Sequence, residues 1–233
     1  MPAFSRLRSA LCWRPEWPFG VAVVVAWVAM TLPSGEPHAH ASRAALPHTA
    51  QLSHWMLMAV AMMLPQALPA LRHVGLNSIR RRRVRGMTLY AASHLALWGA
   101  FGFAALTVVQ ICQMSGVARP AAIVTIIVVA SWQFTATKRR AMGACLRTTP
   151  LALEGWYADW RCMQFALRNT GACIVACWPA MLALAFRAEA VVPMAVLTAV
   201  TLAEARTPIL KRHRWVASAA LVAGVLPIAV HVG

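Results

Sequence analysis

Long uncharged apolar runs alternate with short clusters of arginine and lysine along this chain, and this alternation limits the folds open to it. Of the 233 residues, 60% are hydrophobic and only 12% are charged, and the mean hydropathy is +0.62. Such a chain is too apolar for a soluble domain, whereas about 20 consecutive apolar residues can cross a bilayer as a helix. The runs are continuous and do not alternate as the strands of a membrane barrel do. We therefore expect an all-α, polytopic transmembrane helical bundle.

Seven apolar runs predict seven spans, which cover about residues 19–33, 51–73, 88–112, 120–137, 164–186, 191–210 and 215–232. Basic clusters precede the first span and follow the second, fourth and sixth. Arginine and lysine favour the cytoplasmic side of a membrane. We therefore expect the N-terminus inside, the C-terminus outside, and a multi-pass protein of the bacterial cytoplasmic (inner) membrane. Residues 1–18 form a basic cytoplasmic N-terminus in this interpretation, and residues 19–233 form a single transmembrane domain.

Two connections between the spans carry further signals. Arg80–Arg83 with Arg85 is the strongest topological signal, because it places the end of the second span inside. The segment 141–163 contains Trp156, Tyr157 and Trp160 among charged residues, which favours a helix that lies in the membrane interface.

The formal net charge of +16 comes from 22 basic and 6 acidic residues. The basic clusters lie between apolar runs, where anionic lipid headgroups explain them better than nucleic acid does. We therefore expect the lipid bilayer, and no nucleic acid, as a partner. The sequence contains no glycine-rich phosphate loop, paired carboxylates or two-histidine zinc motif, so we expect no enzymatic activity.

The segment 54–69 is apolar enough for a membrane helix yet carries an imidazole and several thioethers. His54, Met58 and Met62 are four residues apart and fall along one stripe of a helix, with Met63 beside it. Thioether and imidazole ligands suit soft or borderline metals, copper above all. The alternative is that the methionines are flexible apolar fillers.

Cys173 and Cys177 are also four residues apart, so both face one side of the fifth expected helix. Thiolates bind soft metals tightly, and these two cysteines can supply half of a metal site. Met58, Met62 or His54 would then complete the site from the second helix. The alternative is that both cysteines are small packing residues.

Two ionisable residues within the spans are further candidates. Glu204 lies near the inner end of its span, where Arg206 or the following basic cluster is in reach, so it is either an interfacial ion pair or a proton or ion site. His94 is either functional or a hydrogen-bonded packing residue.

Four segments resemble the motifs of one bacterial family, namely Trp55–Pro65, Gln133–Lys138, Cys173–Trp178 and Glu204. The family is called domain of unknown function 2182 and is described as predicted metal-binding integral membrane proteins. The resemblance covers about residues 51–210. It implies a membrane-embedded helical fold and a metal site, and it adds Cys145 as a candidate, because the family pattern has two cysteines after the lysine.

The chain departs from these motifs at positions that matter for metal binding. Ala141 stands at the first of the two cysteine positions after Lys138, and Ala176 replaces one of two adjacent cysteines before Trp178. Val175 stands where glycine is usual, and Ala205 replaces the lysine after Glu204. Two thiols of the family pattern are therefore missing.

The favoured hypothesis is a metal-handling membrane protein that binds, delivers or transports copper through His54, Met58, Met62, Cys173 and Cys177. The alternative is a non-catalytic scaffold or accessory subunit that packs against partner subunits through small residues and has lost metal binding. A third option, a proton-coupled transporter that uses Glu204 and His94, would predict internal repeats, and none is visible in the sequence.

Overall fold

A computed structural model describes residues 14–32, 47–152, 154–186 and 191–206, together with residues 218, 219 and 223. All regular structure in these residues is helical. The helices are α2 (Trp17–Thr31), α3 (His48–Asn77), α4 (Arg83–Met114), α5 (Ala118–Trp132), α6 (Ala136–Cys145), α7 (Gly155–Ala185) and α8 (Val191–Arg206). Residues 1–13, residues 33–46 between the first two expected spans, the basic cluster after the sixth span and most of the expected span over 215–232 lie outside the described residues.

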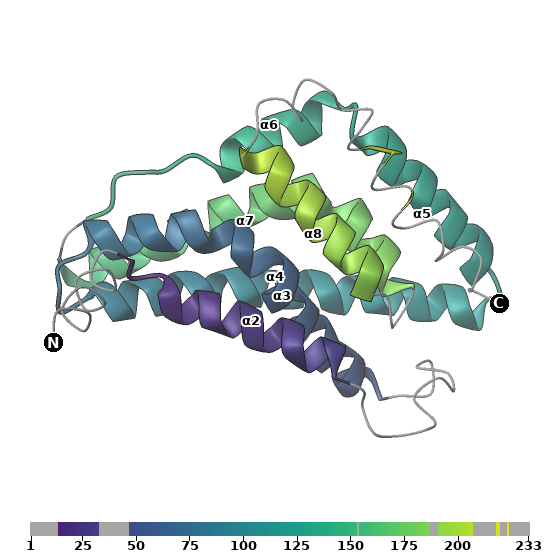
Figure 1. The fold of residues 1–233 in the computed structure, drawn as a ribbon, viewed down its shortest axis with the longest axis horizontal. Coiled ribbons are helices and arrows are strands. Elements are labelled where there is room, and N and C mark those ends of the chain that lie inside the picture. The colour runs from purple at the N-terminus through teal and green to yellow at the C-terminus, as the bar shows by residue number, and fades with distance from the viewer. Residues whose placement is uncertain are drawn as a thin grey trace, which may run out of the picture.

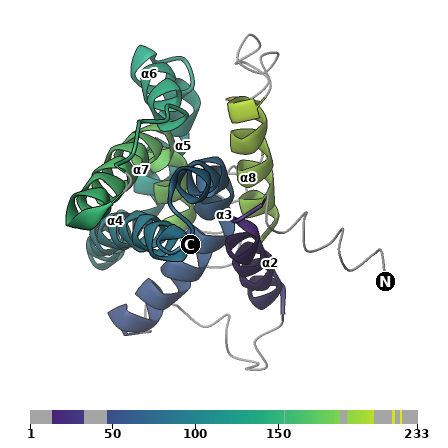
Figure 2. The same cartoon turned by 90° about the vertical axis from the view of Figure 1, so that its left-hand side faces the viewer.

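Two long helices, α3 and α7, organise the packing, and α4 packs against both of them. Helix α3 packs against α2, α4 and α8, and α7 packs against α4, α5 and α6. Seen end on, α3 lies between α2, α4 and α8 (Figure 2). The other half of the bundle is built on α7, over which α5 and α6 form a bent arm (Figure 1).

The lengths and surfaces of these helices agree with a membrane protein. Three of them, α3, α4 and α7, are long and apolar enough to cross a bilayer, and the pair α5 and α6 would make a fourth if it counts as one span. Helix α2 is apolar but has only 15 residues. Large apolar side chains are exposed on several helices, for example Val24, Val25, Phe103, Ile111 and Ile127. Exposed apolar surface of this extent indicates contact with lipid or with another protein.

Helix α3 changes direction midway along its 30 residues (Figure 1). Pro65 and Pro69 lie inside the helix. A proline removes one backbone hydrogen bond and clashes with the preceding turn, which is a standard cause of such a bend. The bend matters for function because Gln66, directly after Pro65, points into the interior of the bundle, as described below.

The span expected over 120–137 contains a break between two helices. Helix α5 ends at Trp132, and α6 begins at Ala136 with its axis turned by 73°. The side chain of Thr135 caps α6 by accepting a hydrogen bond from the Lys138 backbone N–H at 3.2 Å. A side chain that satisfies the first turn stabilises a new helix start. The break turns α6, and with it Lys138, back toward the bundle.

The separate interfacial helix expected within 141–163 is not observed in the described residues. Residues 141–145 complete α6, and Gly155 begins the 31-residue helix α7. Trp156, Tyr157 and Trp160 are exposed, but they form the first turns of α7. The aromatic residues therefore extend the fifth predicted helix and do not form a separate element.

Helices α3 and α4 approach closely where Gly102 faces Trp55. The Trp55 indole is buried, and its Nε1 donates a hydrogen bond to the Trp98 carbonyl at 2.9 Å. A Cβ added at Gly102 would overlap the indole ring. The glycine is therefore required by the close packing of these two helices.

We expect Gly102→Ala to destabilise the protein by about 1–3 kcal/mol, because the overlapping methyl group displaces a buried indole from its hydrogen bond. Gly99→Ala is the matched control on the same helix. Its Cβ would meet the flexible Met56 side chain at 3.2 Å, and alanine has the higher helix propensity. Thermal unfolding in detergent measures both, and equal midpoints for the two variants would contradict the assigned packing.

Candidate functional site

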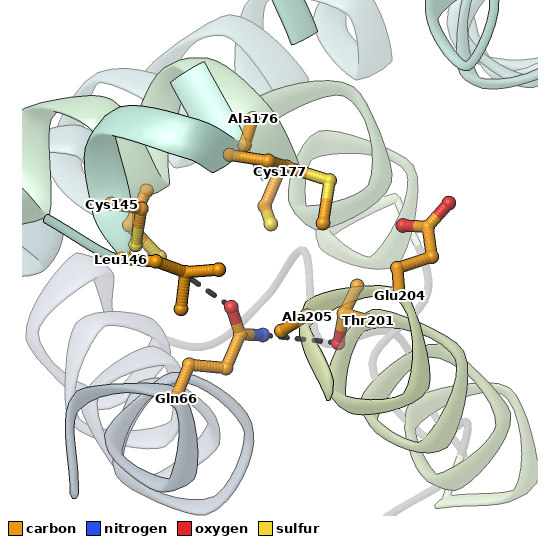
Figure 3. A pocket seen from close by; sticks show the side chains of 10 residues that line it. Gln66, Cys145, Leu146, Ala176, Cys177, Thr201, Glu204 and Ala205 are labelled. Carbon is orange, nitrogen blue, oxygen red and sulfur yellow. Dashed lines mark hydrogen bonds between the residues drawn. The ribbon is translucent and has the colours of Figure 1, made fainter. Parts of the chain in front are cut away.

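A small cavity of about 30 Å³ lies where α3, α6, α7 and α8 meet. Its polar and sulfur-bearing lining residues are Cys145, Cys173, Cys177, Met142, Gln66, Thr201 and Glu204, and Leu146, Ala176 and Ala205 complete the wall (Figure 3). This volume accommodates an ion or a water molecule and is far too small for an organic substrate.

Three cysteines from two helices converge on the cavity. Cys173 and Cys177 lie on one face of α7, and Cys145 is the last residue of α6. The side chains of all three line the same small cavity. All three are free thiols. The spacing in the sequence predicts that Cys173 and Cys177 lie together, and the structure adds Cys145 to them.

Asn169 holds Cys145 at this position. Its Nδ2 donates to the Cys145 carbonyl at 2.6 Å, and the Cys145 thiol donates to Asn169 Oδ1 at 3.6 Å. Asn169 lies one turn before Cys173 on α7, so a single helical face of α7 both presents thiols and anchors the end of α6.

Gln66 connects three helices at the cavity. Its Nε2 donates to Thr201 Oγ1 on α8 at 3.0 Å, and its Oε1 accepts from the Cys173 thiol at 3.8 Å. The same amide group contacts Met63 Sδ at 3.9 Å. The sequence analysis missed Gln66. The signal that was available is an amide side chain directly after a proline in an otherwise apolar helix, where a polar group needs an internal partner.

Glu204 forms a buried ion pair with Lys138. The Lys138 Nζ lies 2.8 Å from Glu204 Oε2, and only 6% and 7% of the two side chains is exposed. Lys138 also donates a hydrogen bond to Gln133 Oε1. Within the described residues Glu204 therefore pairs with Lys138 and not with Arg206, while the basic cluster beyond Arg206 lies outside the described residues. Lys138 is buried although its neighbours Arg139 and Arg140 are exposed, so it does not belong to a purely solvated basic cluster.

The ion pair brings together two segments that are far apart in the sequence. Gln133 and Lys138 flank the break between α5 and α6, and Glu204 belongs to α8. Two buried opposite charges are stable only when each has a partner, because an unpaired charge in a low-dielectric interior costs several kcal/mol. The break in the helix thus places Lys138 where Glu204 needs it.

The remaining predicted site residues lie elsewhere. Met58, Met62 and Met63 are buried in the same apolar core as Cys173 and Cys177 but do not line the cavity. His54 is half-buried, about three turns before Gln66 on α3. His94 is buried, and its Nδ1 lies 2.8 Å from Thr170 Oγ1, one turn before Cys173. Within the described residues, no three His, Cys, Asp or Glu side chains form a group arranged to hold a metal ion.

Comparison with known families identifies the relatives of this chain. The model of a family described as PpoB2, copper chaperone, matches residues 52–229. The chain belongs to this family. The match includes all the helices that form the cavity. Neither the curated proteins nor the solved structures give a match.

Membership of the copper chaperone family supports a copper-related function for this chain. Copper also agrees with the three thiols that line the cavity, because thiolates select Cu(I) over harder ions. The family match does not depend on which sulfur atoms bind the metal, so the ligand set is a separate question.

The ion pair leads to a prediction about stability. We expect Lys138→Met to destabilise the protein by about 3–5 kcal/mol, since it leaves the buried Glu204 without a countercharge. The double variant Lys138→Met/Glu204→Gln removes both charges and should recover most of this loss. Thermal unfolding in detergent provides the measurement. Arg140→Met, which removes an exposed cation from the same helix, is the control and should leave the midpoint unchanged. A double variant as unstable as the single variant would contradict the pairing.

Proposed function

We propose that this protein is a copper carrier of the membrane that holds Cu(I) in the cavity between α3, α6, α7 and α8. The observation that carries the proposal is the convergence of Cys145, Cys173 and Cys177 on one small buried cavity. Soft thiolates favour Cu(I), and a cavity of this volume admits an ion. The family match supports copper as the cargo.

A carrier fits the chemistry of the cavity better than an enzyme does. The cavity has no room for an organic substrate beside a metal ion, and its polar groups are thiols, an amide, a hydroxyl and one paired carboxylate. We therefore infer a non-catalytic role in which copper is bound and passed on. The direction of transfer is set by the partner that receives the metal.

The methionines of α3 suit a path to the cavity. Met58 and Met62 are successive residues of one helical stripe, and Met62 lies one turn before Gln66. Thioethers bind Cu(I) more weakly than thiolates do, so a methionine stripe can pass the ion to the cysteines. In this proposal His54 marks the outer end of the path, and Met63 touches Gln66 at its inner end.

A second candidate function is a scaffold or accessory subunit without copper. The motifs of the family that the chain resembles have cysteines at the positions of Ala141 and Ala176. Ala176 lines the cavity. A loss of thiols at the cavity is what a chain that no longer binds metal would show. Against it stand the three thiols that still line the cavity.

The ion pairs at the start of α7 support a proposal for the orientation in the membrane. Asp159 pairs with Arg82, and with Arg85 at 2.6 Å, so the start of α7 lies beside the start of α4. We propose that this arginine-rich end is cytoplasmic. Because α4 leads away from this end and α7 starts there, we propose that α5 and α6 together return the chain across the membrane as one bent span. The seven-span topology, with the N-terminus inside and the C-terminus outside, extends this arrangement to the parts of the chain that the structure does not describe.

Reporter fusions test this orientation. We expect alkaline phosphatase fused after Gly116 to be active, because the turn between α4 and α5 faces outward, and a fluorescent protein fused after Arg147 to fluoresce in the cytoplasm. A phosphatase fused after Arg147 should be inactive. If it is active, as it is after Gly116, α5 and α6 form a re-entrant loop, and the proposed crossing is wrong.

The copper proposal is tested by titrating the detergent-purified protein with Cu(I) against a chromophoric Cu(I) chelator. We expect about one tightly bound Cu(I) per wild-type chain. The Cu(I) affinity of the variant Cys145→Ser/Cys173→Ser/Cys177→Ser should be lower by about 100-fold or more. Loss of a residue that only supports a metal ligand lowers the affinity by up to about 100-fold, so loss of the ligands themselves should cost at least as much.

The matched control for this titration is Cys112→Ser/Cys162→Ser, which removes two thiols that do not line the cavity. It should bind Cu(I) as the wild type does. If the folded wild-type protein binds no Cu(I), the copper proposal is wrong and the scaffold function is favoured. The variant Met58→Leu/Met62→Leu separates two roles of the methionines: lower affinity makes them ligands, and unchanged affinity with slower loading assigns them to the path.

A further inference from the structure

One amide side chain contacts both a methionine of α3 and a cysteine of the cavity. Gln66 Nε2 donates a hydrogen bond to Met63 Sδ at 3.9 Å, and Gln66 Oε1 accepts one from the Cys173 thiol at 3.8 Å. We propose that Gln66 is the gate between the thioethers of α3 and the thiols of α7: its amide closes the passage from Met63 to Cys173 and moves aside when Cu(I) passes. The inference rests on the proposed function, since it concerns the same cavity.

The Gln66 amide forms the part of the cavity wall that faces Met63. Gln66 and Cys173 line the cavity, whereas Met63 does not. Met63 is buried in the same apolar core as Cys173. An ion that moves from one of these sulfur atoms to the other therefore has to enter the space that the amide fills, because the amide contacts both.

The chemistry of an amide suits a gate better than a copper ligand. Cu(I) prefers thioether and thiolate sulfur, while carbonyl oxygen suits harder ions such as Mg²⁺ and Ca²⁺. Gln66 is therefore a poor intermediate stop for the ion between two sulfur ligands. The step assigned to Gln66 breaks and forms only hydrogen bonds, and copper keeps its oxidation state throughout.

Thr201 on α8 holds the amide in place. Gln66 Nε2 donates to Thr201 Oγ1 at 3.0 Å (Figure 3). The Thr201 hydroxyl in turn donates to the Leu197 carbonyl at 2.8 Å, which leaves its oxygen free to accept from the amide. A hydrogen bond between neutral groups contributes much less than one to a charged group. The contact with Thr201 therefore keeps the gate closed at rest and still permits it to open.

The backbone of α3 is loosened on both sides of Gln66. Pro65 has no N–H, so the Ala61 carbonyl lacks its helical donor and accepts instead from Trp27 Nε1 on α2 at 3.0 Å. Pro69 removes the helical donor of the Pro65 carbonyl in the same way. A residue flanked by two missing helical hydrogen bonds can shift at a lower cost than one in a regular helix.

Kinetics distinguish a gate from a ligand or a structural tie. A gate changes the barrier between two states and leaves the states themselves as they are, so it changes the loading and release rates by the same factor. Loss of a copper ligand would lower the affinity. Loss of a contact that only ties helices together would lower the unfolding midpoint and leave both rates unchanged.

Stopped-flow measurements on the detergent-purified full-length protein test the inference. Loading is followed anaerobically after mixing with the acetonitrile complex of Cu(I), and release after mixing the loaded protein with excess chromophoric Cu(I) chelator. Thr201→Val keeps the amide and removes its acceptor on α8. We expect both rate constants of this variant to rise by about 2- to 10-fold, the range that the loss of one neutral hydrogen bond allows. Gln66→Ala removes the gate and should raise both rates at least as much.

Thr198→Val is the matched control. It makes the same change three residues earlier on α8, where the Thr198 hydroxyl also donates to a carbonyl of its own helix, that of Met194 at 2.7 Å, but Thr198 does not line the cavity. Its rates should equal those of the wild type, and thermal unfolding checks that each variant is folded. If Gln66→Ala does not fold, Thr201→Val decides the question.

Three results would overturn the gate and leave the proposed function intact: wild-type rates in Thr201→Val, equal acceleration in Thr198→Val, or a lower affinity with an unchanged loading rate in Gln66→Ala. A folded wild-type protein that binds no Cu(I) would overturn both the gate and the proposed function.

Discussion

The contact between Lys138 and Glu204 is the interaction on which the arrangement around the cavity depends. Two opposite charges are buried against each other in a protein whose surroundings are mainly apolar, and each is tolerable only because the other is present. Their pairing needs α6 to point back toward α8, which a straight helix over 120–137 would not allow. The break after Trp132 and the Thr135 cap are the local structural solution to this long-range requirement.

The cavity results from departures from regular helix packing. Helix α3 bends near Pro65, and Gln66 emerges there to contact α7 and α8. Helix α6 ends at Cys145, where the Asn169 amide satisfies the last carbonyl of the helix. Because both helices deviate at the same level of the bundle, their side chains leave a small space that the α7 thiols line. Straight, uninterrupted helices would have closed it with apolar side chains.

The sequence predicts part of this architecture well. Continuous apolar runs indicate helices and a membrane-compatible bundle, and four-residue spacing brings Cys173 and Cys177 to one side of α7. The break at 133–135 was missed, because the polar segment Gln133–Lys138 also suits the end of a span, and only Thr135 indicates the start of a new helix. The start of α7 was also misjudged, since Trp156 and Trp160 are typical both of an interfacial helix and of the first turns of a long one.

Local sequence patterns could not predict which residues of different helices contact each other. Gln133, Lys138 and Glu204 each belong to a recognisable segment, yet only the fold shows that they meet. The same holds for Gln66 with Thr201 and for Cys145 with Cys173. Spacing arguments work within one helix because the helical period is fixed. They say nothing about which faces of two helices pack together, and for that reason the methionine stripe of α3 and the α7 cysteines were assigned to one site.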